Sequence, residues 1–227
     1  MKYKLTSTTK EYCGITLYQI QALRDFGCVI NVKKGDLGGW IEKETNLSQD
    51  NDCWVSDNAS VSDNALVSGN ALVFGDAWVS DNARVSGNAL VYGDAWVSSN
   101  ALVYGDARVS GNALVYGNAL VFGDARVSDN ARVSDNARVS GNASVSGNAW
   151  VLGKLNLIGG CFYHYKEKSE EIEKIEVSDN YELLAKNPEL AEEEKEVAKD
   201  LVDIRISRST LEELKKQGIK VKNKYEM

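Results

Sequence analysis

Apolar and polar positions alternate with a six-residue period through the middle of the chain. Valine occupies every sixth position from Val55 to Val151, seventeen times, and alanine every sixth from Ala59 to Ala149, sixteen times, without an insertion. Each unit has the form Asn/Asp-Ala-x-Val-(Ser/Tyr/Phe)-(Gly/Asp), so alanine and valine point to the same side of an extended backbone. The Gly/Asp and Asn/Asp pair that follows is typical of turns, because these residues adopt positive φ or hydrogen-bond their own backbone. The pattern therefore predicts a short strand and a turn, repeated many times.

A fixed period of this kind is typical of a parallel β-helix, in which stacked units enclose a core that one unit cannot bury alone. The units resemble those of the hexapeptide-repeat family, whose fold is a left-handed β-helix with a large aliphatic residue at the valine positions and a small one at the alanine positions. The resemblance implies three units per triangular turn. Eighteen units, from Cys53 to Ile158, then predict an all-β solenoid of about six turns. The fold leaves the function open, because one solenoid serves both enzymes and scaffolds.

The flanking segments predict two further parts, so we divide the chain into residues 1–52, 53–158 and 159–227. An open solenoid end exposes an unpaired edge, and a small N-terminal β cap is therefore expected, with strands at 2–5, 14–22, 28–32 and 40–41. The third part is expected to be a C-terminal α/β segment. It has strand patterns at 161–165 and 219–221, and helix patterns at 188–201, beginning at Pro188 after Asn187, and at 209–218, with a Ser209-x-x-Glu212 capping box.

The cap sequence carries a second resemblance. Residues 17–26 read LYQIQALRDF, and residues 35–42 and 46–49 read GDLGGWIE and NLSQ. These strings are similar to the leader of uncharacterised hexapeptide-repeat proteins encoded by phages, prophages and some bacteria, which are often labelled transferases. The resemblance implies an accessory protein of a phage or prophage. No chemical motif in this sequence supports the transferase label.

Composition limits where the protein acts. The chain has 227 residues, 43% of them hydrophobic, and a net charge of −7. The sequence shows neither a membrane-spanning apolar run nor a secretory signal pattern, so we expect no membrane contact and a cytoplasmic protein, of the bacterial host if a phage encodes it. The acidic balance argues against general nucleic-acid binding. The cysteines, which lack CxxC spacing, are expected to be reduced and buried: Cys13, Cys28, Cys53 and Cys161.

Candidate catalytic chemistry is sparse. Enzymes of the resembling family place a histidine in a cleft between protomers, as a general base or a zinc ligand, and this chain has one histidine, His164. A single imidazole can act as a base, whereas a three-histidine zinc site would need one from each of three protomers. The long loop that acyltransferases of this fold insert between turns is missing. Acyl transfer with His164 as base is therefore the alternative, and no cofactor or metal site is assigned.

The residues on either side of each valine are expected to point outward. In the second to fourth turns they are apolar and aromatic, more than a soluble monomer usually exposes. We therefore expect a homotrimer packed about an axis along the helix. Terminal segments folded over part of this surface are the competing explanation, and the two are compatible. The fifth turn differs, because it carries Arg126, Arg132 and Arg138, one per face, each followed two residues later by a serine.

Arginine beside an aromatic ring suggests a site for a planar anion, since guanidinium binds phosphate in a fork and a ring stacks on a base. The candidate ligand-binding residues are Arg108, Arg126, Arg132, Arg138, Tyr92, Tyr116 and Phe122. Alternatively, these arginines pair with corner aspartates such as Asp124, Asp129 and Asp135, or with the acidic C-terminal segment. The sequence favours a non-enzymatic binding or scaffold protein that sequesters a small anionic, nucleotide-like ligand or blocks a host protein.

Overall fold

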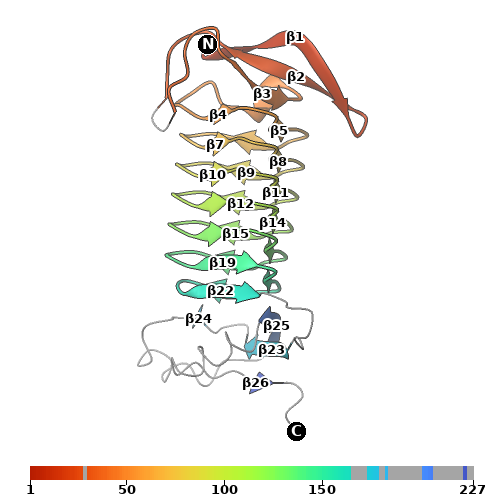
Figure 1. Ribbon diagram of the computed structural model, residues 1–227, viewed down its shortest axis with the longest axis vertical. Coiled ribbons are helices and arrows are strands. Elements are labelled where there is room, and N and C mark those ends of the chain that lie inside the picture. The colour runs from red at the N-terminus through yellow and green to blue at the C-terminus, as the bar shows by residue number, and fades with distance from the viewer. Residues whose placement is uncertain (28–29, 165–172, 179–181, 184–200, 207–221, 224–227) are drawn as a thin grey trace.

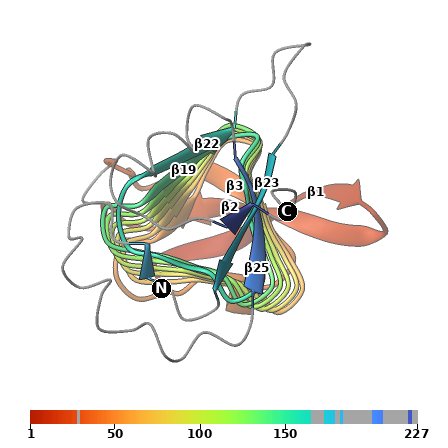
Figure 2. The same cartoon turned by 90° about the horizontal axis from the view of Figure 1, so that it is seen from below.

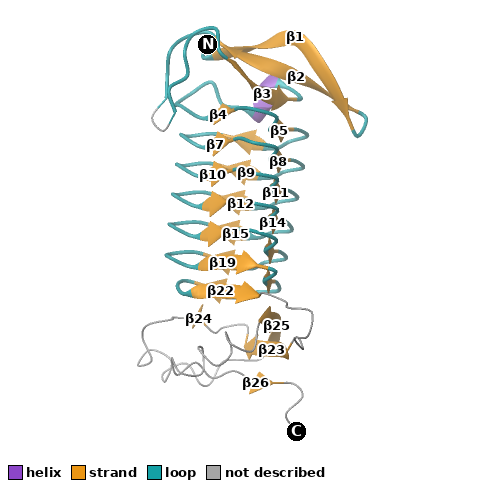
Figure 3. Cartoon of the chain, in the orientation of Figure 1, coloured by secondary structure: helices purple, strands orange, loops and turns teal. Residues whose placement is uncertain are grey.

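The chain forms an all-β solenoid of about seven turns with an antiparallel β cap at its N-terminal end, as a computed structural model shows (Figure 1). The structure describes residues 1–27, 30–164, 173–178, 182–183, 201–206 and 222–223. A view along the solenoid shows its flat sides and a hairpin of the cap that projects beyond them (Figure 2). Two-residue strands joined by short loops make up nearly all of the solenoid (Figure 3).

Three stacks of parallel strands, here called faces 1, 2 and 3, enclose the core. Face 1 contains β4 (Trp54–Val55), β7 (Leu72–Val73), β10 (Leu90–Val91), β13 (Arg108–Val109), β16 (Arg126–Val127), β19 (Ser144–Gly147) and β22 (Cys161–His164). Face 2 contains β3 (Leu37–Ile41), β5 (Ser60–Val61), β8 (Trp78–Val79), β11 (Trp96–Val97), β14 (Leu114–Val115), β17 (Arg132–Val133) and β20 (Trp150–Val151). Face 3 contains β6 (Leu66–Val67), β9 (Arg84–Val85), β12 (Leu102–Val103), β15 (Leu120–Val121), β18 (Arg138–Val139), β21 (Asn156–Leu157) and β24 (Glu182–Leu183).

The predicted repeats correspond to strands β4 to β21, but the solenoid has about seven turns, one more than the six predicted. Strand β3 precedes them on face 2, where Ile41 pairs with Val61, and β22 follows on face 1, where Phe162 pairs with Val145. Strand β24 follows on face 3. These strands lie outside the six-residue register, so the repeat count alone gives about six turns instead of about seven.

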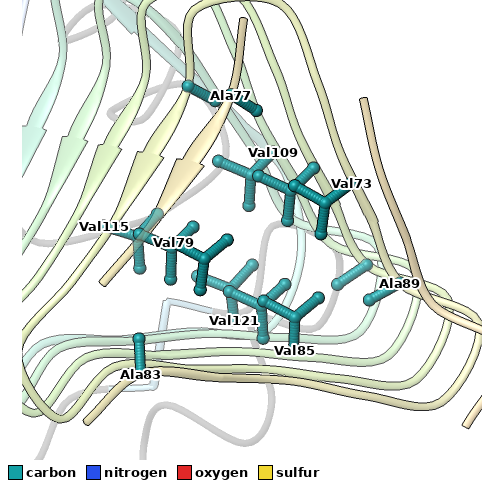
Figure 4. Close-up of a cluster of buried hydrophobic side chains, with 14 of the residues drawn as sticks. Val73, Ala77, Val79, Ala83, Val85, Ala89, Val109, Val115 and Val121 are labelled. Carbon is teal, nitrogen blue, oxygen red and sulfur yellow. The ribbon is translucent and has the colours of Figure 1, made fainter. Parts of the chain in front are cut away.

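Valine and alanine fill the interior. Valines at the repeat positions are stacked in rows along each face, with the small alanines beside them (Figure 4). Val85, Val103 and Val121 of face 3 are fully buried, as are the alanines beside them, Ala83, Ala101 and Ala119. A parallel ladder with this register places identical side chains one strand spacing apart, about 4.8 Å. The interior is therefore an uninterrupted apolar column that leaves little room for a larger side chain.

The corners of the solenoid use left-handed backbone at a position held by glycine or aspartate, and in one repeat by Ser99. Gly87 has φ +69°, and a Cβ there would lie 2.8 Å from the backbone nitrogen of Gly105 in the next turn. Asp81 adopts φ +58° at the equivalent position, and its Oδ2 accepts a hydrogen bond from the backbone N–H of Ser99 at 2.8 Å. The carboxylate thus gains a contact with the next turn that offsets the strained backbone.

We expect Gly87→Ala to destabilise the solenoid more than Gly87→Asp. Alanine brings a Cβ into left-handed backbone, which costs roughly 1–2 kcal/mol, and against the Gly105 backbone. Aspartate brings the same Cβ together with a carboxylate that can accept the next N–H, as Asp81 does. Urea unfolding followed by circular dichroism measures the free energy of unfolding of both variants. An alanine variant at least as stable as the aspartate variant would contradict this explanation.

The cap begins with a long antiparallel hairpin, β1 (Tyr3–Tyr12) and β2 (Ile15–Ala22), which pairs with β3. Its two-residue turn, Cys13-Gly14, has positive φ at both positions, as the primed hairpin turns require. The hairpin contacts face 2, where the Tyr12 ring lies edge-on to Trp78 at 4.2 Å. The N-terminal segment therefore covers part of the aromatic surface, as one of the two explanations predicted.

A buried lysine joins the cap to the first turn. Lys2 is 1% exposed, and its ammonium donates to the Cys53 carbonyl at 2.8 Å and to the Asn51 carbonyl at 3.3 Å. It also lies 3.2 Å from the Cys53 sulfur. Burial raises the pKa of the Cys53 thiol, and the Lys2 ammonium opposes this shift. The 3-10 helix η1 (Glu44–Asn46) follows β3, and the Tyr3 hydroxyl donates to the Glu44 carbonyl at 2.9 Å.

The cysteine prediction is only partly right. The three cysteines that the structure describes are free thiols. Cys53 is buried, whereas Cys13 and Cys161 are exposed, because Cys13 lies at the hairpin tip and Cys161 takes an outward position next to Ser144. The remaining cysteine, Cys28, lies outside the described residues, as does residue 29. The described part of the strand predicted at 28–32 is not a strand, because Ile30 lies in a bend and Val32 forms only an isolated bridge to Phe26.

The C-terminal segment is described only in part. Strands β23 (Glu173–Ser178), β25 (Leu201–Ile206) and β26 (Lys222–Asn223) continue the sheet of face 2, with β20 pairing antiparallel to β25. The strand predicted at 161–165 is confirmed as β22. The helices predicted at 188–201 and 209–218 and the strand predicted at 219–221 lie outside the described residues, except that Leu201 begins β25 and is wrongly assigned to a helix. The part of the chain that is described contains no helix long and apolar enough to cross a membrane.

Candidate functional site

Outward side chains form two columns on every face. One column holds the residue before each valine, the other the residue after it, and both lie on the opposite side of the strand from the core. The parallel register places Arg108 next to Arg126 on face 1, Leu114 next to Arg132 on face 2, and Leu120 next to Arg138 on face 3. The predicted distribution of the arginines, one of the fifth turn on each face, is confirmed.

On face 1 the candidates Tyr92, Arg108 and Arg126 lie in consecutive turns. The Tyr92 ring stacks on Phe74 of the preceding turn, with ring centroids 4.8 Å apart and planes 4° from parallel. The Tyr92 backbone N–H donates to the carbonyl of Val109, which places Tyr92 beside the turn that carries Arg108. Both guanidinium-bearing side chains are exposed.

On face 2 the structure adds a partner that the sequence reading did not assign. The Arg132 guanidinium lies over the Trp150 ring of the following turn, 4.8 Å from its centroid. Tyr116, the candidate aromatic of this face, lies in the preceding turn with 38% of its surface exposed. A cation over an aromatic face is attracted by the ring quadrupole, so Arg132 is already held by its neighbour.

On face 3 the candidates are Phe122 and Arg138. Phe122 stacks on Tyr104 of the preceding turn, with centroids 5.0 Å apart. Arg138 follows in the next turn and is exposed. The three predicted pairs thus lie on three different sides of the prism, and the seven candidate residues do not form one site within a protomer.

The corner aspartates bond to backbone instead of to arginine. Asp129 Oδ2 accepts the Gly147 N–H at 3.0 Å, and Asp135 Oδ2 accepts the Gly153 N–H at 3.1 Å. Within the described residues one ion pair is present, between Lys33 and Asp25 in the cap, and it involves none of these arginines. For the described part of the chain, the alternative in which corner aspartates neutralise the arginines is therefore wrong.

Ring stacking also lowers the exposure of the predicted aromatic surface. Besides the stacks on faces 1 and 3, Trp78 and Trp96 stack on face 2 with centroids 5.4 Å apart. The indole N–H groups of Trp78 and Trp96 donate to the hydroxyls of Ser62 and Ser80, each at 3.2 Å. Three large rings of face 2 stay more than one third exposed: Trp96, Tyr116 and Trp150.

His164, the candidate catalytic base, lies in β22 opposite Gly147 of face 1. Its backbone thus continues the ladder beyond the repeats. No cluster of three His, Cys, Asp or Glu side chains that would hold a metal ion occurs among the residues that the structure describes.

Comparisons with known proteins point to the same architecture. Seven segments match the YdcK beta solenoid repeat, at residues 65–81, 83–99, 101–117, 107–123, 113–129, 125–138 and 137–153. A relative named "Uncharacterized acetyltransferase YdcK", from Escherichia coli (strain K12), is 36% identical over 64 residues, which are 25% of this chain and 19% of that protein. The chain thus covers about one fifth of the length of this relative. The chain contains β-solenoid repeats of the YdcK type and is distantly similar to that protein over the matched repeats.

Proposed function

We propose that the protein is a non-enzymatic binding module that holds a small anionic, nucleotide-like ligand on the outside of a rigid solenoid. The observation that carries this proposal is the set of outward arginines. They are exposed on all three faces and form no ion pair with any described residue, although the chain as a whole is acidic: Arg84, Arg108, Arg126, Arg132 and Arg138. Exposed guanidinium groups without a carboxylate partner are available to bind phosphate.

The same proposal includes an assembly and a setting. The exposed rings of face 2, Trp96, Tyr116 and Trp150, support a homotrimer in which this face lies against another protomer. The resemblance of the leader supports an accessory factor of a phage or prophage, acting in the host cytoplasm by sequestering the ligand or by blocking a host protein. The left-handed winding belongs to this proposal too, since the hexapeptide-repeat resemblance implies it.

Calorimetric titration of the full chain tests the binding function. The ligands are GMP and AMP, with inorganic phosphate and uncharged guanosine as comparisons. We expect saturable binding of a nucleotide. Its affinity should fall as salt is added, because salt screens charge pairing at an exposed site. If neither nucleotide nor phosphate binds at millimolar concentration, the proposed function is wrong.

Acyl transfer is the second candidate, favoured by the name of the Escherichia coli relative. Its only candidate base is His164 in β22. An acyltransferase should be stabilised against heat by acyl-CoA, and its turnover should fall by a factor of about 10²–10⁴ in His164→Ala, as expected when a general base is lost. Absence of stabilisation by acetyl-CoA and of acetyl transfer to amine substrates would leave the binding function as the better proposal.

A further inference from the structure

The outer column of face 1 changes from aromatic rings to serines at the position where the two arginines begin. Reading along the turns, the column holds Phe74 and Tyr92, and then Ser110, Ser128 and Ser146. One side of the Tyr92 ring is covered by Phe74. Its other side is turned toward the layer of Ser110, which has no ring. The aromatic stack thus ends at Tyr92, and the next layer of this column carries a serine in place of a ring.

The serines that follow the ring columns on the other faces lie in closed positions. Ser134, between Tyr116 and Leu152 on face 2, is 6% exposed, and Ser140, between Phe122 and Ile158 on face 3, is 5% exposed. Ser110 on face 1 is instead partly exposed, as is Ser128 beside it. Ser134 and Ser140 each lie between two bulky side chains of their column, whereas Ser110 is followed by a second serine. The consecutive serines Ser62 and Ser80 of face 2 are buried too, but there the Trp78 and Trp96 indoles bond to them. Face 1 therefore has two consecutive, partly exposed serines beside Tyr92, here called the serine strip.

Two guanidinium groups border this strip. Arg108 and Arg126 are adjacent in register, and both are exposed without an ion pair to any described residue. Like charges on directly adjacent strands repel each other, so an anion between them is favoured. The corner carboxylate Asp106 accepts a hydrogen bond from the Asn88 amide at 2.9 Å, and Asp129 accepts one from Gly147.

The dimensions suit one ligand class. The arginine column and the serine column are two residues apart along each strand, about 6.6 Å, so a sugar can connect a base in one column to a phosphate in the other. Bases stack readily on aromatic side chains. A comparable ring end occurs on face 3, where Tyr104 adjoins Ser86 and Arg84, but the residues before and after Arg84 in its column are leucines. That position offers one guanidinium where face 1 offers two.

We propose that face 1 binds a nucleoside monophosphate. The base stacks on Tyr92 over Ser110, and Arg108 and Arg126 bind the phosphate in forks. This assignment rests on the proposed binding function and specifies its site and ligand class. Arg138, which is also exposed but adjoins the buried Ser140, has no part in it.

Titration of GMP and AMP into variants of the full chain tests the site. Arg108→Ala and Arg126→Ala should each weaken binding about tenfold or more, because each removes a charge-assisted hydrogen bond. Ser110→Tyr should abolish binding, since its ring would extend the Phe74–Tyr92 stack into the layer of Ser110. The matched controls Arg138→Ala and Arg84→Ala should bind within about twofold of the wild type. All of these positions are outside the core, and unfolding curves confirm that each variant is folded.

The outcomes separate the site from the function. Nucleotide binding that survives Ser110→Tyr and both face 1 arginine variants, but is lost in Arg138→Ala or Arg84→Ala, would overturn the face 1 site and leave the binding function standing. A wild-type chain that binds neither nucleotide nor phosphate would overturn both. Equal affinity for GMP and inorganic phosphate would overturn the role of the Tyr92 ring, and with it the nucleotide assignment.

Discussion

Val109→Asp should unfold the middle of the solenoid. Val109 is fully buried in the fourth strand of face 1, between Val91 and Val127 of the adjacent strands. A carboxylate there has no partner in the apolar column, and an uncompensated buried charge costs about 3–5 kcal/mol, a large share of the total stability of a typical domain. Urea unfolding followed by circular dichroism should show a much lower midpoint than in the wild type.

The consequence should also be local, because each turn of a solenoid contacts only its neighbours. We expect the single transition to divide into two, as the turns on either side of position 109 unfold separately. Val109→Ala, which only removes two methyl groups, should keep one transition and lose about 2 kcal/mol. The neighbouring outward change Arg108→Ala should alter stability by less than about 0.5 kcal/mol. A Val109→Asp midpoint equal to that of the wild type would show that the valine column is not the core.

The solenoid could be predicted because its core admits few side chains. Valine and alanine two residues apart give each short strand one apolar side, and the corner residues specify the turn that follows, so the sequence period translates directly into strands β4 to β21. The added turn could not be predicted in this way. Ile41 and Phe162 fill core positions next to Val61 and Val145, but they do so outside the period and with side chains that the repeat does not use.

The positions of the candidate site residues could be predicted from the sequence, but the side chains that surround them could not. A strict register assigns each outward arginine to a face, and the structure confirms that assignment. An outward arginine of the repeats makes a cation–π contact only where the next turn carries an aromatic ring at the same position, as Arg132 does with Trp150. Whether a serine is open depends on the side chains of adjacent turns, such as the Trp96 indole that bonds to the buried Ser80. These contacts join residues about one turn apart, so a reading of each repeat by itself does not reveal them.

The role of Lys2 was also outside the reach of the repeat pattern. A lysine next to an alternating strand normally indicates a solvated side chain. Here the ammonium reaches the carbonyls of the first turn, because the strands that end there leave their backbone acceptors without a further turn to donate to them. The cap therefore closes the solenoid with a charged donor as well as with apolar side chains.

Lys2→Met should loosen the cap while the solenoid stays folded. Methionine keeps an unbranched chain of similar length but donates no hydrogen bond, so the Cys53 and Asn51 carbonyls lose the ammonium that now lies 2.8 and 3.3 Å away. Leaving buried acceptors unpaired costs about 1–3 kcal/mol each. Hydrogen exchange of the backbone amides, measured by mass spectrometry, should become about tenfold or more faster in residues 1–53 and stay nearly unchanged in the central repeats.

Lys10→Met, in the strand β1 that Lys2 precedes, is the matched control. The Lys10 ammonium contacts the Asn58 carbonyl at 3.2 Å and the Trp40 ring. Lys10 is only half-buried, whereas Lys2 is fully buried, so water can replace its contacts and the exchange of the cap should change little. If Lys2→Met leaves the exchange of residues 1–53 at the wild-type rate, the carbonyls are satisfied without the ammonium. The cap would then be held by Tyr3, Ile20 and Ile41, whose side chains are fully buried against the first turn, and a large-to-small change at Ile20 would be the more damaging substitution.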